Sequence, residues 1–337
     1  MQVWIRRFAL LLLPLGFLAV MVAAPLLSLA FYDGEGAWAE VVADDYMRLR
    51  LGWTVAQAVL TCVLVTALGV PAAWVLARMD FAGRRTVLRL LMLPFVMPTL
   101  VAGMGVLALF GAHGMLAAGW QDTPWLLIYG NVFFNLPVLV RSAYQGFVRV
   151  PQARLLSAQS LGADAWRRFV WVEWPVVRAW VAGGACLVFL YCFSGFGLAL
   201  LLGGERFATV EVEIYRLVAY ELDMARASVL VWLVLAVTAA AGGLYAYWSK
   251  RVAVDKSVSP LPPRAPIWAW EKWLTATVLA MLAVCCLLPL AAVWLKAVSA
   301  GSSWAVLLEA QTWAAVWNTV RFSAAAVAAA TVLGVLY

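Results

Sequence analysis

The chain has little charge for its length. Only 12% of its 337 residues are Asp, Glu, Lys or Arg, whereas a soluble domain has about 25%. Two stretches carry no charge at all: Phe8–Phe31 over 24 residues and Trp53–Ala77 over 25. A helix of that length is roughly 36 Å long and crosses a ~30 Å hydrocarbon core. The runs are continuous rather than alternating, so they predict an all-α polytopic membrane protein and exclude a barrel.

Residues that carry metal or covalent chemistry are also scarce. The sequence has one histidine, His113, and five cysteines within apolar segments, Cys62, Cys186, Cys192, Cys285 and Cys286. Their spacing is not typical of a metal site or a disulfide, so we expect them to pack as small apolar side chains. A membrane-embedded enzyme or scaffold is the alternative class, but no constellation of His, Cys and carboxylates supports it. We therefore expect no catalytic residues, metal or bound cofactor.

Devices that drive transport are missing as well. No Gly-x-x-x-x-Gly-Lys phosphate-binding loop occurs, because the four lysines follow Ser249, Asp255, Glu271 and Leu295. None of the spans predicted below contains Asp or Glu, which argues against a carboxylate proton relay. If this chain takes part in active transport, a separate subunit must supply the energy by hydrolysing ATP.

Counting apolar residues predicts eight membrane spans. They are residues 8–31, 53–77, 88–112, 125–148, 176–202, 228–249, 273–296 and 315–337. The first is too long for the apolar region of a signal peptide, so we expect it to be retained. Pro94 and Pro98 predict that the third span is kinked.

Basic residues indicate the orientation. With the N-terminus in the cytoplasm, 16 of the 24 Lys and Arg residues fall in cytoplasmic segments, and 12 of the 17 acidic residues fall outside. This is the bias of the positive-inside rule. The net charge of +7 is then explained by membrane orientation, and nucleic-acid binding is unnecessary.

The sequence contains a possible internal repeat. Residues 53–70 align with residues 318–335 at a shift of 265, with identical residues at six pairs of positions, Thr54/Thr319, Val55/Val320, Thr66/Thr331, Leu68/Leu333, Gly69/Gly334 and Val70/Val335. We predict a first six-helix unit over 1–250, a cytoplasmic linker over 251–271, and the start of a second unit, apparently truncated, over 272–337. The competing interpretation is that any two apolar helices look alike.

A polar stretch, residues 151–175, separates the fourth and fifth spans. Pro151 suits a first helical turn, Gly162 a helix end, and Asp164 the N-cap of a second short helix. Pro175 is expected to break that second helix before the fifth span. The first helix has an apolar face, so it docks in a groove or lies on lipid.

This stretch resembles the cytoplasmic signature loop of bacterial ABC-importer permeases. Counted from Gly162, Ala158, Val172 and Pro175 fall at signature positions, while Leu156 replaces the usual Glu and Ser157 the first Ala. The resemblance implies a coupling helix that fits a cleft on an ATPase. The residues that it assigns to ATPase coupling are Ser157, Ala158, Gln159, Gly162, Asp164, Arg167, Arg168, Val172 and Pro175.

The resemblance extends over most of residues 50–337. The strings VFFNLPVLVR (132–141) and FSGFGLALLLGG (193–204) are similar to those of thiamine-transport permeases, which are double-length members of this family. Ferric iron or polyamine permeases are the alternative. The resemblance implies alternating access in a bacterial inner membrane with three partners: an ATP-binding cassette ATPase dimer, a periplasmic or lipid-anchored substrate-binding protein, and membrane lipid. Substrate-binding residues stay unknown.

Overall fold

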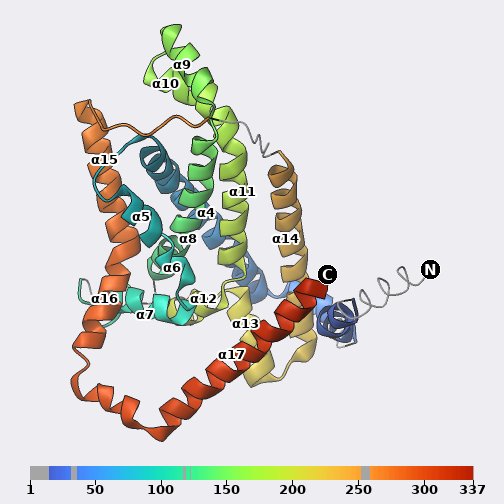
Figure 1. Cartoon of the computed structure of the whole chain (residues 1–337). Coiled ribbons are helices and arrows are strands. Elements are labelled where there is room, and N and C mark those ends of the chain that lie inside the picture. The colour runs from blue at the N-terminus through green and yellow to red at the C-terminus, as the bar shows by residue number, and fades with distance from the viewer. Residues whose placement is uncertain (1–14, 32–35, 117–118, 122, 252–258, 337) are drawn as a thin grey trace.

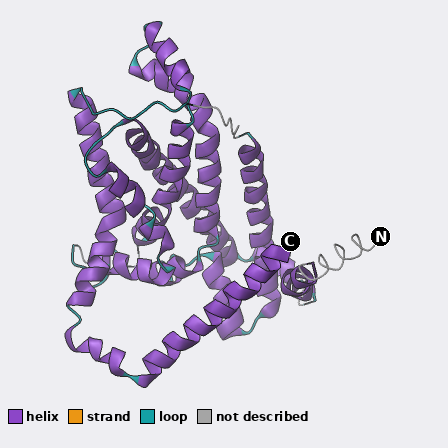
Figure 2. Cartoon of the chain, viewed as in Figure 1, coloured by secondary structure: helices purple, strands orange, loops and turns teal. Residues whose placement is uncertain are grey.

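The computed structural model describes residues 15–31, 36–116, 119–121, 123–251 and 259–336, and most of them form helices (Figure 1, Figure 2). These residues contain no β-strand. Their β-type pairing is limited to two isolated bridges, Met79–Arg264 and Pro151–Pro260. The predicted all-α fold is confirmed.

Six helical segments are long and apolar enough to span a membrane. They are α4 (Asp45–Arg78), α8 (Pro124–Val148), the run of α10 (Ala165–Arg168), η2 (Phe169–Glu173) and α11 (Trp174–Phe193), α14 (Met224–Lys250), the run of α15 (Ala269–Leu282), η4 (Ala283–Leu287) and α16 (Leu288–Val298), and α17 (Ala310–Leu336). Each overlaps one predicted span, and α8 agrees with its prediction to within one residue at either end.

The third predicted span, 88–112, is broken rather than kinked. Helices α5 (Arg84–Leu90) and α6 (Leu93–Val96) meet α7 (Thr99–Phe110) at an angle of 104°. Met97 is extended, with ψ of 145°, because the ring of Pro98 disfavours a helical conformation in the preceding residue. Proline therefore ends one helix here instead of bending it.

The predicted count of eight spans is not confirmed. The described part of the chain has six candidate spans, or seven if the bent pair counts as one. Of the first predicted span, 8–31, the structure shows a shorter apolar helix over Leu15–Leu29, and residues 8–14 lie outside the described residues.

The fifth predicted span, 176–202, is also shifted. Its helix starts at Ala165 and ends at Phe193, and a separate helix, α12 (Phe196–Leu202), follows. Gly195 allows this sharp break, since a Cβ atom at that position would lie 2.6 Å from the carbonyl oxygen of Tyr191. The remaining elements are short: η1 (Ala19–Ala23), α2 (Ala24–Ala30), α3 (Ala37–Ala43), α9 (Gln152–Ser160), α13 (Val210–Arg216), η3 (Leu217–Glu221) and η5 (Gly301–Leu308).

The core lies where α4, α8 and α11 pack together. Two polar side chains inside it are paired: the Asn131 amide of α8 donates to Gln57 Oε1 of α4 at 2.7 Å, and Gln57 Nε2 donates to the carbonyl of Cys192 at 2.9 Å. Such pairing is required because a membrane interior offers no water. These three helices carry the polar stretch 151–175 at one end of the bundle (Figure 1).

Candidate coupling site

Helix α9 is the first of the two predicted short helices, and it starts directly after Pro151. It ends at Ser160, and Gly162, two residues later, has φ of +80°. The next N–H, that of Ala163, donates to the carbonyl of Ala158 at 3.0 Å. A Cβ atom at Gly162 would meet no atom within 4 Å. The left-handed backbone, rather than crowding, is therefore what favours glycine here.

The second short helix begins where predicted. The Asp164 carboxylate accepts a hydrogen bond from the Arg167 N–H at 2.7 Å and caps α10. The prediction that Pro175 breaks this helix is wrong, since the helix continues from Ala165 to Phe193. A π-helical turn, η2, precedes Pro175 and widens the hydrogen-bond spacing to i→i+5, so the proline is accommodated near the start of α11.

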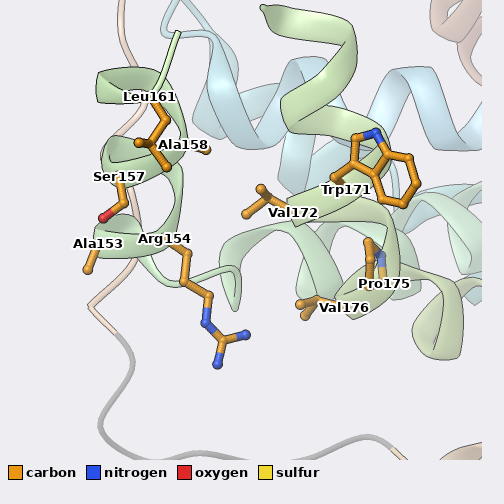
Figure 3. Close-up of a pocket in the computed structure, with 9 residues that line it drawn as sticks. All are labelled: Ala153, Arg154, Ser157, Ala158, Leu161, Trp171, Val172, Pro175 and Val176. Carbon is orange, nitrogen blue, oxygen red and sulfur yellow. The ribbon is translucent and has the colours of Figure 1, made fainter. Parts of the chain in front are cut away.

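A cavity of about 480 Å³ separates α9 from the start of α11 (Figure 3). Val172 points across it toward α9. Its lining consists of Ala153, Arg154, Ser157, Ala158, Leu161, Trp171, Val172, Pro175 and Val176. Four of the nine predicted coupling residues thus face one groove: Ser157, Ala158, Val172 and Pro175. The other five do not line it.

Two of those five lie on the other side of the loop. The Arg168 guanidinium donates to Gln159 Oε1 at 3.2 Å and ties α10 to α9. Both residues line a second cavity, of about 500 Å³, beside α4 and the segment 261–271. The predicted residues are therefore divided between two faces of the helical pair, with Gly162 and Asp164 shaping the turn that joins them.

Large apolar side chains project from this pair into the surroundings. Leu161 is 88% exposed, Trp171 77%, Trp166 71% and Leu156 46%. An apolar surface of this kind on a polar loop is typical of a binding face. The sequence signature indicated the loop but not these exposed tryptophans, whose position depends on the α10–η2 helix.

A buried ion pair lies at the base of the loop, and sequence reasoning missed it. Arg78 Nε donates to Glu173 Oε1 at 2.8 Å, and both side chains are 6% exposed. Trp74 Nε1 donates to the other carboxylate oxygen at 2.9 Å, and Arg78 Nη2 to the carbonyl of Phe147. The only sequence signal was a lone Glu among aromatic residues in FVWVEW. The pair fixes the start of α11 to the end of α4.

Part of the predicted linker is bound to the same end of the bundle. The Gln152 N–H donates to the carbonyl of Ser259 at 3.1 Å. The backbone of Arg264 bonds the Arg78 carbonyl and the Asp80 N–H, at 3.0 and 2.8 Å. Three prolines in 260–263 keep this segment extended. It connects the coupling loop, α4 and the start of α15.

Comparison with known proteins identifies the family of this chain. Residues 66–254 match the family described as binding-protein-dependent transport system inner membrane component. The thiamine transport system permease protein ThiP of Salmonella typhimurium is 32% identical over 322 residues, which cover 92% of this chain and 58% of that protein. ThiP of Brucella abortus is 35% identical over 239 residues, covering 67% of this chain and 44% of that protein.

The fold has a counterpart among solved structures. A chain of the bacterial alginate ABC transporter, in complex with an alginate pentasaccharide-bound periplasmic protein, superposes with a TM-score of 0.62 at 15% identity, covering 74% of this chain and 95% of that one. At that identity the likeness concerns the fold alone. The chain spans less than two thirds of the length of the curated relatives it matches. On its sequence match over 66–254, the chain belongs to the family of binding-protein-dependent transport system inner membrane components.

Proposed function

We propose that this chain forms part of the transmembrane pathway of an ATP-driven, binding-protein-dependent importer of thiamine or its phosphates. The observation that carries the proposal is the α9–Gly162–α10 loop. It holds a largely apolar groove, lined by the exposed Trp171, at one end of a membrane bundle. A coupling element needs this combination, because it must bind a soluble partner and transmit force to the helices behind it.

The route for that force runs from the loop into the core. Helix α10 continues through η2 into α11 without interruption, and the Arg78–Glu173 pair joins this helix to α4. A displacement of the loop therefore moves two core helices together. ATP binding by a separate ATPase dimer would push the loop and open the pathway outward, and hydrolysis would reset it.

The proposal places the loop, the ends of α4 and α14, and the segment 259–268 in the cytoplasm, with the N-terminus on the same side. A substrate-binding protein would then dock at the opposite end, which carries the acidic residues of α3 and α13. We also propose that a first six-helix unit ends at residue 250 and that a second unit begins at residue 272. Support for the repeat comes from α4 and α17, which begin at Asp45 and Ala310, 265 residues apart.

Thiamine is proposed as the cargo because two curated relatives that each match 92% of this chain are named as thiamine transport permeases. The test is uptake of labelled thiamine into proteoliposomes that contain the permease and its ATPase, with ATP inside and the binding protein outside. We expect saturable entry that stops without ATP or the binding protein. Entry of ferric iron or a polyamine instead would refute the cargo, and entry of none of these, without stimulated ATP hydrolysis, would refute the importer.

A further inference from the structure

The second cavity, behind the α9–α10 loop, is lined by more arginine side chains than carboxylates. Three arginines line it, Arg78, Arg168 and Arg264, together with two carboxylates. Arg78 pairs with Glu173 at 2.8 Å, and Arg264 Nη1 donates to Glu271 at 3.1 Å. Arg168 has no carboxylate partner among the described residues and donates only to the neutral Gln159. The cavity therefore has one net positive charge.

A buried hydrogen-bond donor in this lining is unused. Arg78 is 6% exposed, and its Nη1 atom is buried without a hydrogen-bond partner within the described part of the chain. Leaving a charged buried donor unmatched is costly. Arg78 and Arg168 line the same cavity. An anionic group there would pair with the guanidinium of Arg168 and lie beside that of Arg78, because arginine binds phosphate oxygens through directed N–H groups.

An apolar cavity of about 380 Å³ adjoins the charged one, and the two share Trp74, Ala165 and Trp270. Its other lining residues are all apolar: Val70, Pro71, Trp166, Phe169 and Leu274. Val70 and Leu274 belong to the candidate spans α4 and α15, so this cavity extends to membrane depth. Trp166 and Trp270 are 71% and 48% exposed, and tryptophan gathers at the headgroup level of a bilayer.

Together the two cavities match an amphiphile with a negative headgroup. We propose that they bind one anionic phospholipid from the leaflet on the coupling-loop side. Its phosphate lies against Arg168 in the charged cavity that Arg78 also lines, and one acyl chain lies along Val70 and Leu274. A soluble phosphate compound would use the charged cavity only, and the continuity with an apolar cavity at membrane depth favours the lipid. Basic pockets between transmembrane helices bind such headgroups by the same physics.

The site would link lipid to the coupling machinery, because its walls come from α4, from α10 and from the segment that leads to α15. The inference requires only that the protein is embedded in a bilayer. It does not depend on the cargo, so its failure and the failure of the thiamine proposal are separate results.

The test measures lipid binding to the purified full chain by native mass spectrometry. The probes are phosphatidylglycerol, phosphatidylcholine with the same acyl chains, and inorganic phosphate. We expect preferential binding of phosphatidylglycerol. Arg168→Gln should weaken it about fivefold, since one basic residue contributes roughly 1 kcal/mol near an anionic headgroup. Arg167→Gln is the matched control: it removes the same charge one residue away, from a side chain that lines neither cavity, and should keep the preference.

A second variant tests the apolar part. Leu274→Trp fills the cavity without changing charge and should also weaken phosphatidylglycerol binding. Equal binding of the two lipids, or an unchanged preference in Arg168→Gln, would overturn the proposal. Full competition by inorganic phosphate combined with no effect of Leu274→Trp would overturn it in favour of a site for a soluble anion.

Discussion

Helices α4 and α17 have related sequences and opposite surroundings. In an 18-residue apolar stretch of α4, 39% is buried, whereas in the corresponding stretch of α17 none is. Thr54 and Gly69 of α4 are buried, and their counterparts at the shift of 265, Thr319 and Gly334, are exposed. Hydropathy therefore determines that both segments are membrane helices, but only contacts with other helices determine which one belongs to the core.

Polar contacts also differ between the two helices. Helix α4 is held at both ends, by the Arg78–Glu173 pair and by Trp53 Nε1, which donates to the carbonyl of Phe207 at 2.8 Å. In α17, Thr319 and Thr331 donate only to carbonyls of their own helix. Matched substitutions in α4 and α17 measure how much the contacts of each helix contribute to stability.

The largest effect is expected at the buried ion pair. Arg78→Leu leaves the Glu173 carboxylate buried without its partner, which should lower the free energy of unfolding by about 3–5 kcal/mol. Arg321→Leu in α17 removes an exposed arginine and should change it by less than about 0.5 kcal/mol. Unfolding of the 337-residue chain by SDS in mixed micelles measures both, and equal losses would contradict the assigned difference.

A glycine pair gives the next effect. A Cβ atom at Gly69 would lie 2.9 Å from Leu139 Cδ2 and 3.5 Å from Leu136 Cδ1, while at Gly334 it would meet nothing within 4 Å. Gly69→Val should therefore cost up to about 3 kcal/mol through overpacking. Gly334→Val should be close to neutral in the same assay. A loss at Gly334 as large as that at Gly69 would show that α17 is packed.

The threonine pair should give a smaller difference. The Val210 N–H donates to Thr54 Oγ1 at 3.0 Å, so Thr54→Val removes a buried acceptor between α4 and α13 and should cost about 1 kcal/mol. Thr319→Val removes only a bond to Ala315 within its own helix. Hydrogen exchange at Val210 provides a local readout, and unchanged protection there in Thr54→Val would argue against the contact.

The smallest expected effect is on the pH dependence of stability. It concerns α13, which is bonded to α4 through Thr54. Burial raises the pKa of the Glu211 carboxyl above its ordinary value of 4.5. The folded state then binds protons more tightly than the unfolded state, so stability declines as pH rises through and just above 4.5. Glu211→Gln should flatten this decline. The pH dependence of unfolding measures this, and a decline in Glu211→Gln as steep as in the unmodified chain would contradict the assignment.

The sequence was informative where the controlling chemistry is local. The count of apolar residues located α8 to within one residue, although Arg141 lies within it, and Pro151, Gly162 and Asp164 marked the helix ends of the α9–α10 loop correctly. The effect of Pro175 could not be predicted, because the π-helical turn that accommodates it forms earlier in the helix.

Long-range contacts were not accessible in the same way. Arg78 and Glu173 are 95 residues apart in the chain, and neither flanking sequence specifies the other. The 104° break at Met97–Pro98 required knowing whether the protein would bend or end the helix at a proline. The ring of Pro98 accounts for the extended Met97, but a proline bends some helices and ends others, so the sequence alone did not distinguish the two outcomes.

The coupling role of the α9–Gly162–α10 loop is the central claim, and one pair of variants tests it most directly. Gly162 and Gly36 both have positive φ, +80° and +96°, and a Cβ atom would meet nothing within 4 Å at either. Valine imposes similar backbone strain at both positions, but only Gly162 shapes the loop. Co-purification of the ATPase should be lost in Gly162→Val and kept in Gly36→Val, and substrate-stimulated ATP hydrolysis in proteoliposomes should be lost in Gly162→Val. Wild-type assembly and stimulation in Gly162→Val would contradict the claim.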